Sequence, residues 1–82
     1  MGRCAVSISS NIAEGFSRNG KKEKTQFFRI ALGSLTELQN QLLIARDIGY
    51  ISHKIFQELA ERSVIVAKLI NGLIRGLDRL KY

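Results

Sequence analysis

Apolar residues recur with a helical period over most of the chain. The pattern is clearest between about residues 22 and 48, where apolar positions repeat every seven residues. The repeat consists of Phe28, Leu35 and Leu42, with Ala31, Leu38 and Ala45 interleaved three residues later. Gly49 follows at a position typical of a helix end. The spacing therefore predicts one long helix over residues 22–48.

A second long helix is predicted over residues 52–80. Its two seam columns are Phe56, Ser63, Ile70 and Leu77, and Leu59, Val66, Leu73 and Leu80. Ser52 is a good N-cap, because its hydroxyl can accept a hydrogen bond from a free backbone N–H of the first turn. The connection from Gly49 to Ile51 is so short that the two long helices must run antiparallel.

The N-terminal segment is more ambiguous. Ala5, Ile8 and Ile12 have helical spacing, whereas Cys4, Val6 and Ile8 would alternate as in a strand. We favour a helix over residues 4–15, because residues 12–14 continue the helical period and Gly15 suits a C-terminus. Residues 16–21 are predicted to be a polar turn. The fold class is thus all-α, with one antiparallel helical bundle as a single domain over residues 1–82.

The apolar stripes on both long helices are wider than one helix pair requires. The residues expected in the core are Phe28, Leu35, Leu38, Leu42, Leu59, Val66, Ile70, Leu73 and Leu77. Further apolar residues, Ile74 among them, flank this seam. The short N-terminal helix cannot cover all of them, so we expect self-association or a missing helix. A monomeric three-helix protein is the alternative.

Composition narrows the function classes. The 82 residues carry a net charge of +6, which favours polyanions or acidic partner surfaces. No charge-free run approaches the roughly 20 residues that span a membrane, and no signal peptide is recognised. The single cysteine, Cys4, fits a reducing compartment, so we expect a cytoplasmic protein without a membrane partner.

Motifs for catalysis, cofactors and metals are weak. Residues 15–21 match the phosphate-binding pattern G-x-x-x-x-G-K, but Lys22 stands where a serine or threonine would hold magnesium. His53, the only histidine, has no glutamate three residues before it, as a metal site in a bundle would require. Cys4 is expected to be a small buried thiol. We therefore expect no enzyme activity, no cofactor and no metal.

Basic residues are better candidates for a site. Positive charge gathers around the turn between the first two predicted helices, in Arg18, Lys21, Lys22, Lys24 and Arg29, with Glu23 opposing it. A second group, Lys68, Arg75 and Arg79, is predicted on the outer face of the last helix. Clustered cations are typical of phosphate-contacting surfaces, although a solvated charged face is the simpler interpretation. No base-reading module is present, so binding to RNA or DNA would depend on the backbone.

Two sequence elements carry a resemblance. Residues 10–15 read Ser-Asn-Ile-Ala-Glu-Gly, and residues 31–38 read Ala-Leu-Gly-Ser-Leu-Thr-Glu-Leu. Together they resemble the bacterial four-helix-bundle family whose founding members are encoded in intervening sequences of 23S ribosomal RNA genes. The likeness is close over about residues 3–50 and extends to residues 51–80 in helical pattern only. Four polar residues of these elements are the candidate site residues that the resemblance implies: Asn11, Glu14, Ser34 and Glu37.

The resemblance implies several properties. Family members begin with one more helix, which is expected to be absent here, and relatives form homopentamers. A homodimer of three-helix units is the other oligomer considered. One branch of the family is the nucleic-acid-binding accessory protein of diversity-generating retroelements, and no catalysis is implied. Two functions remain open: an oligomeric nucleic-acid-binding or ribonucleoprotein accessory protein, and a protein–protein assembly module.

Overall fold

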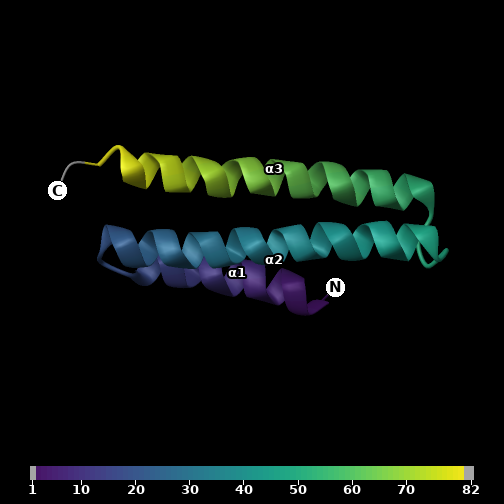
Figure 1. Cartoon of the computed structure of the whole chain (residues 1–82), viewed down its shortest axis with the longest axis horizontal. Coiled ribbons are helices and arrows are strands. Elements are labelled where there is room, and N and C mark those ends of the chain that lie inside the picture. Colours follow the sequence, from purple (N-terminus) through teal and green to yellow (C-terminus); the bar gives the residue numbers. More distant parts are fainter. Residues whose placement is uncertain (1, 81–82) are drawn as a thin grey trace.

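The computed structural model describes residues 2–80, and these form three helices (Figure 1). They are α1 (Gly2–Ser17), α2 (Lys21–Asp47) and α3 (His53–Asp78). The all-α class is confirmed, and the boundaries lie within two residues of the predicted 4–15, 22–48 and 52–80. Both α1 and α3 pack against α2, and α3 runs alongside α2 in the antiparallel direction (Figure 1). The molecule is elongated, with extents of 49 × 20 × 13 Å.

The connection between α2 and α3 is closed by local backbone contacts. Gly49 has a φ of 81°, a conformation that glycine adopts without the Cβ strain of other residues. Its N–H donates to the carbonyl of Arg46, and the Tyr50 N–H donates to that of Ala45. This pair of bonds is the Schellman motif, which satisfies carbonyls left free at a helix end. Ser52 caps α3 as predicted, with its Oγ accepting from the Ile55 N–H at 3.1 Å.

Gly15 has a different role from the predicted one. α1 continues past it to Ser17, so Gly15 does not end the helix. It is buried because the ring of Phe28 lies directly on its backbone. A Cβ at this position would lie only 2.8 Å from Phe28 Cδ1. Absence of a side chain therefore lets α1 approach α2 closely.

The core lies where the three helices meet. Its buried residues come from all of them and are Ile8, Phe28, Ala31, Leu35, Ile70 and Ile74. Leu38, Val66, Leu73 and Leu77 pack against this cluster and are partly buried. Two predictions are wrong: Leu59 is 36% exposed, and Ile74, assigned to the flank, is 6% exposed. The repeat does not show which side of α3 its neighbours cover: Leu59 borders an open groove between α1 and α3, whereas Ile74 belongs to the core cluster.

One side of this core is open. A groove of about 650 Å³ runs between α1 and α3 above α2, and we call it the apolar groove. Its apolar lining consists of Ala5, Ile8 and Ile12 of α1, Leu35, Leu38 and Leu42 of α2, and Leu59 and Val66 of α3. Within residues 2–80, no helix combines the length and the apolar character needed to cross a membrane.

Candidate nucleic-acid interface

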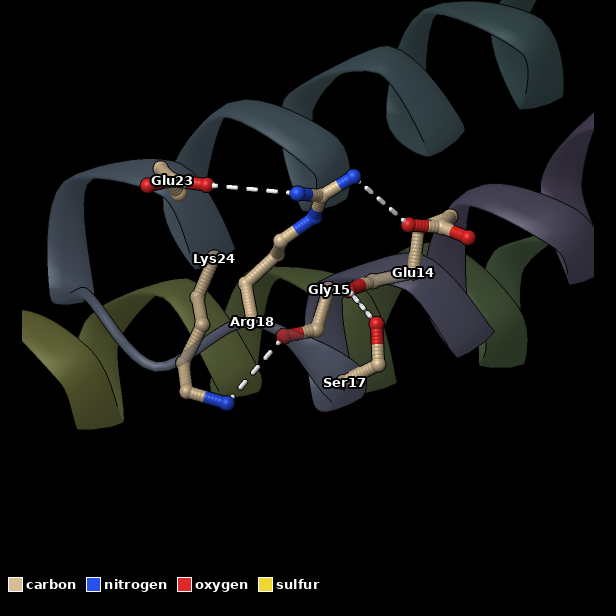
Figure 2. A network of polar contacts seen from close by, with 6 residues as sticks. All are labelled: Glu14, Gly15, Ser17, Arg18, Glu23 and Lys24. Carbon is tan, nitrogen blue, oxygen red and sulfur yellow. Dashed lines mark hydrogen bonds and ion pairs between the residues drawn. The ribbon is translucent and has the colours of Figure 1, made fainter.

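Arg18 lies at the α1–α2 turn, held between two carboxylates. Its guanidinium forms ion pairs with Glu14 at 3.0 Å and with Glu23 at 3.7 Å (Figure 2). The same group lies 5.1 Å from the ring centroid of Phe27. Exposed pairs of this kind contribute little stability, about 0–1 kcal/mol. They do balance the arginine charge, which leaves Arg18 poorly placed to attract a phosphate.

Lys24 is also engaged within the turn. Its Nζ donates to the carbonyl oxygen of Gly15 at 3.2 Å (Figure 2) and to that of Phe16 at 3.1 Å. Both carbonyls belong to the last turn of α1, where the helix dipole is negative and carbonyls lack helical partners. Lys24 therefore caps α1 from the first turn of α2, which is a structural role.

The other cations of the turn line a separate surface. Lys21, Lys22 and Arg29 border a groove of about 760 Å³, which we call the basic groove. Its remaining lining residues are Thr25, Gln26 and Ile30 of α2 and Asp78 of α3. Within residues 2–80, no carboxylate lies within ion-pair distance of Lys21, Lys22 or Arg29. Their charge remains available to a ligand, with Asp78 as the one acidic residue of the lining.

Helical spacing explains how α2 builds this surface. Lys21, Thr25 and Arg29 follow one another at intervals of four residues, as do Lys22, Gln26 and Ile30. Residues four apart lie on the same helix face, so the cations and hydrogen-bonding side chains form one strip. The charge pattern of the sequence does not identify Thr25, Gln26 or Asp78 as part of this surface. The four-residue spacing could have indicated the first two, whereas Asp78 enters only through the antiparallel packing of α3.

The basic residues of α3 lie elsewhere. Lys68, Arg75 and Arg79 are all exposed, and they lie about 140–180° around α3 from the buried Ile70 at about 100° per residue. Asp78, which borders the basic groove, is about 80° from Ile70 on this scale. These cations thus lie on the exposed side of α3, as predicted, and none of them is in the lining of the basic groove.

The two motif elements meet at the contact of α1 with α2. The Oγ atoms of Ser7 and Ser34 are 2.7 Å apart, and Asn11 Nδ2 donates to the Ser7 carbonyl at 2.7 Å and to its Oγ at 3.2 Å. Cys4 is buried, and its Sγ donates weakly to Gln41 Oε1 at 3.6 Å. Asn11 and Ser34 therefore join one polar network, whereas Glu14 lies in the Arg18 pair and Glu37 is exposed.

The sequence of the chain matches a family model. The model described as 23S rRNA-intervening sequence protein matches residues 1–72, which include both motif elements and most of α3. The chain belongs to this family. No curated protein and no solved structure was found to match it. The resemblance seen in the sequence is confirmed, and residues 2–80 of this chain form three helices.

Other motif residues of this 23S rRNA-intervening sequence protein family member have ordinary structural surroundings. The G-x-x-x-x-G-K match begins inside α1 and ends at the start of α2, so it is not a strand–loop–helix phosphate site. His53 is exposed, with its ring 6.2 Å from that of Phe56. Within the described residues, no group of three His, Cys, Asp or Glu side chains is arranged to hold a metal.

Proposed function

We propose that this protein is a non-enzymatic accessory protein that binds the phosphate backbone of RNA or DNA through the basic groove. The observation that carries the proposal is the strip of Lys21, Lys22 and Arg29, which have no ion-pair partner within residues 2–80. Arg18 and Lys24 serve the turn instead, so they support the surface and do not contact the ligand. Phosphate contacts position a nucleic acid without reading its bases, so binding is tolerant of sequence.

The test is fluorescence anisotropy with a labelled mixed-sequence RNA and a DNA of equal length over a salt series. If three phosphates are neutralised per chain, log K falls against log salt with a slope of about −2 for single strands and about −3 for a duplex. The variant Lys21→Gln, Lys22→Gln and Arg29→Gln should flatten this slope and weaken binding to all sequences alike.

A matched control separates the groove from net charge. The variant Lys54→Gln, Lys68→Gln and Arg75→Gln removes the same amount of charge from the outer face of α3. We expect it to retain most of the binding. Equal losses in the two variants would mean that net charge alone attracts the nucleic acid. A wild-type protein that binds neither RNA nor DNA at physiological salt would end the proposal.

Protein–protein assembly is the second candidate function, and the apolar groove favours it. The groove is lined by apolar residues from all three helices, and α3 exposes Ile65 and Leu69 beside it by 58% and 63%. Exposed apolar surface of this extent is typical of an interaction site. We propose that the protein self-associates, and an oligomer would also present several basic grooves to one strand and raise its avidity. Sedimentation at micromolar concentration tests this, and a monomer would contradict it.

A further inference from the structure

We propose that Asp78 makes the basic groove select RNA over DNA, because its carboxylate accepts a hydrogen bond from a ribose 2′-hydroxyl. The proposal rests on the nucleic-acid binding proposed above and names the kind of strand that the groove takes. Within residues 2–80, Asp78 is the one acidic residue of a lining that otherwise consists of Lys21, Lys22, Arg29 and three uncharged residues. A carboxylate at this place repels the phosphates that the cations attract, so phosphate binding alone does not account for it.

The antiparallel packing of α3 on α2 brings Asp78 to the groove. α2 begins at Lys21 and α3 ends at Asp78, so the last turn of α3 lies beside the first turns of α2 (Figure 1). The groove therefore has its cations on α2 and a carboxylate on α3. A strand whose phosphates follow the α2 cations turns its sugars or bases toward Asp78, because the phosphates avoid the like charge.

Helix stability gives no reason for an aspartate at this position. Asp78 is the last residue of α3, where the helix dipole is negative and favours cations over carboxylates. Within residues 2–80, no lysine or arginine lies within ion-pair distance of its carboxylate, although three cations line the same groove. Asp78 is also exposed, so a ligand can reach it. A residue that is locally unfavourable and unpaired in this way is typical of a functional position.

The chemistry of the strand decides what this carboxylate can recognise. An ionised carboxylate accepts hydrogen bonds and donates none. Between the ends of a DNA strand, the phosphates and deoxyriboses carry no hydrogen-bond donor, so a carboxylate beside them meets only repulsion. Ribose adds a 2′-hydroxyl, which can donate and which lets a protein distinguish RNA from DNA. This hydroxyl is next to the 3′ phosphate, so one nucleotide can offer a phosphate to the cations and a donor to Asp78.

Three single strands of one mixed sequence test the proposal. They are RNA, DNA and 2′-fluoro RNA, which keeps a ribose-like sugar pucker but has no 2′ donor. Fluorescence anisotropy at one salt concentration gives the dissociation constants. We expect the wild-type protein to bind RNA about tenfold more tightly than DNA, which is the effect of one hydrogen bond to a charged group. The 2′-fluoro strand should bind like DNA.

A pair of variants assigns the preference to Asp78. Asp78→Ala should bring the ratio of RNA to DNA affinity to about one, and DNA itself should bind more tightly once the repulsion is gone. Glu61→Ala is the matched control, since it removes the same charge from an exposed position of α3 outside the groove lining. It should change both affinities by the same factor and keep their ratio. Thermal unfolding should show no loss of stability in Asp78→Ala, because the helix end loses an unfavourable charge.

The outcomes separate this inference from the proposed function. A wild-type protein that binds neither RNA nor DNA overturns both. Equal binding of RNA and DNA, an unchanged ratio in Asp78→Ala, or 2′-fluoro RNA that binds as tightly as RNA overturns this inference alone. Cytosine-rich and thymine- or uracil-rich strands of both sugars complete the test, because base amino groups are the other donors of a nucleic acid. A base preference that Asp78→Ala removes equally from RNA and DNA would assign Asp78 to a base and overturn its assignment to ribose.

Discussion

α2 contacts its two neighbours in different ways. Against α1 the contact is close and built from small residues: Gly15 lies under the Phe28 ring, and the hydroxyls of Ser7 and Ser34 are 2.7 Å apart. Against α3 the contact depends on branched side chains such as Ile70 and on one polar pair, Gln39 with Ser63 at 3.0 Å. The first contact has no room for a side chain at Gly15, whereas the second leaves apolar residues of α3 such as Ile65 and Leu69 exposed. Both motif elements of the family lie in the first contact.

Phe28 joins the two contacts, and its loss should have the largest effect. Its ring is 2% exposed and packs on Gly15 and edge-on against Phe16 at a centroid distance of 5.4 Å. Phe28→Ala leaves a cavity at the meeting point of three helices and should lower the free energy of unfolding by about 3–5 kcal/mol. Thermal and urea unfolding followed by circular dichroism measure this. A loss below about 1 kcal/mol would contradict the assigned core.

Substitution of Gly15 should give the next largest change in the free energy of unfolding. We expect alanine to destabilise the protein at Gly15, where the helices are in close contact, and to stabilise it at a glycine on the open surface of a helix. Gly15→Ala must displace the Phe28 ring, and overpacking of this kind costs about 1–3 kcal/mol. Gly33→Ala is the control, since a Cβ there meets nothing within 4 Å. Alanine is favoured over glycine inside a helix by about 0.5–1 kcal/mol, so the control should be stabilised. Urea midpoints that move the same way for both variants would refute the close approach.

The contrast between Gly15 and the helix ends shows what the sequence can predict. Helical period, Gly49 and Ser52 are local signals, and they located α2 and α3 to within two residues. Gly15 was assigned to a helix end because its partner, Phe28, is thirteen residues away and no local pattern connects them. Leu59 and Ile74 were misplaced for a related reason, since exposure depends on which side of α3 its neighbours cover.

The candidate site was predicted in part. Its cations were identified from their clustering at the turn, but clustering cannot show which charges are already balanced. Arg18 is balanced by Glu14 and Glu23, and Lys24 is bound to carbonyls at the end of α1. These contacts depend on how the turn folds back against α1. The structure is therefore needed to distinguish Arg18 and Lys24 from Lys21, Lys22 and Arg29, whose charges are not balanced in this way.

The hydrogen bond between Ser7 and Ser34 should contribute less to stability than Phe28 or Gly15, and it allows the α1–α2 and α2–α3 contacts to be compared. Removing one hydroxyl by Ser34→Ala should cost about 1 kcal/mol, a typical net value for a partly buried hydrogen bond. In a double-mutant cycle with Ser7→Ala, the coupling energy should be at least about 0.5 kcal/mol. The corresponding cycle for Gln39→Ala and Ser63→Ala measures the α2–α3 contact. We expect the Ser7–Ser34 coupling to be the larger one, and equal couplings would remove the distinction between the two contacts.

Substitution of Lys24 or Lys22 should change stability the least. The two variants show which lysine of the turn stabilises the fold and which one binds nucleic acid. Lys24→Met removes the cation that binds the Gly15 and Phe16 carbonyls, so we expect a loss of about 0.3–1 kcal/mol in stability. Lys22→Met leaves stability within about 0.5 kcal/mol, because the side chain is exposed and has no such contact. Nucleic-acid binding should respond in the opposite order, with Lys22→Met lowering affinity and salt slope and Lys24→Met changing both little. Each variant removes one positive charge from the same turn, so net charge is matched. If binding instead falls equally in both, the nucleic acid is responding to the charge of the whole turn and not to the basic groove.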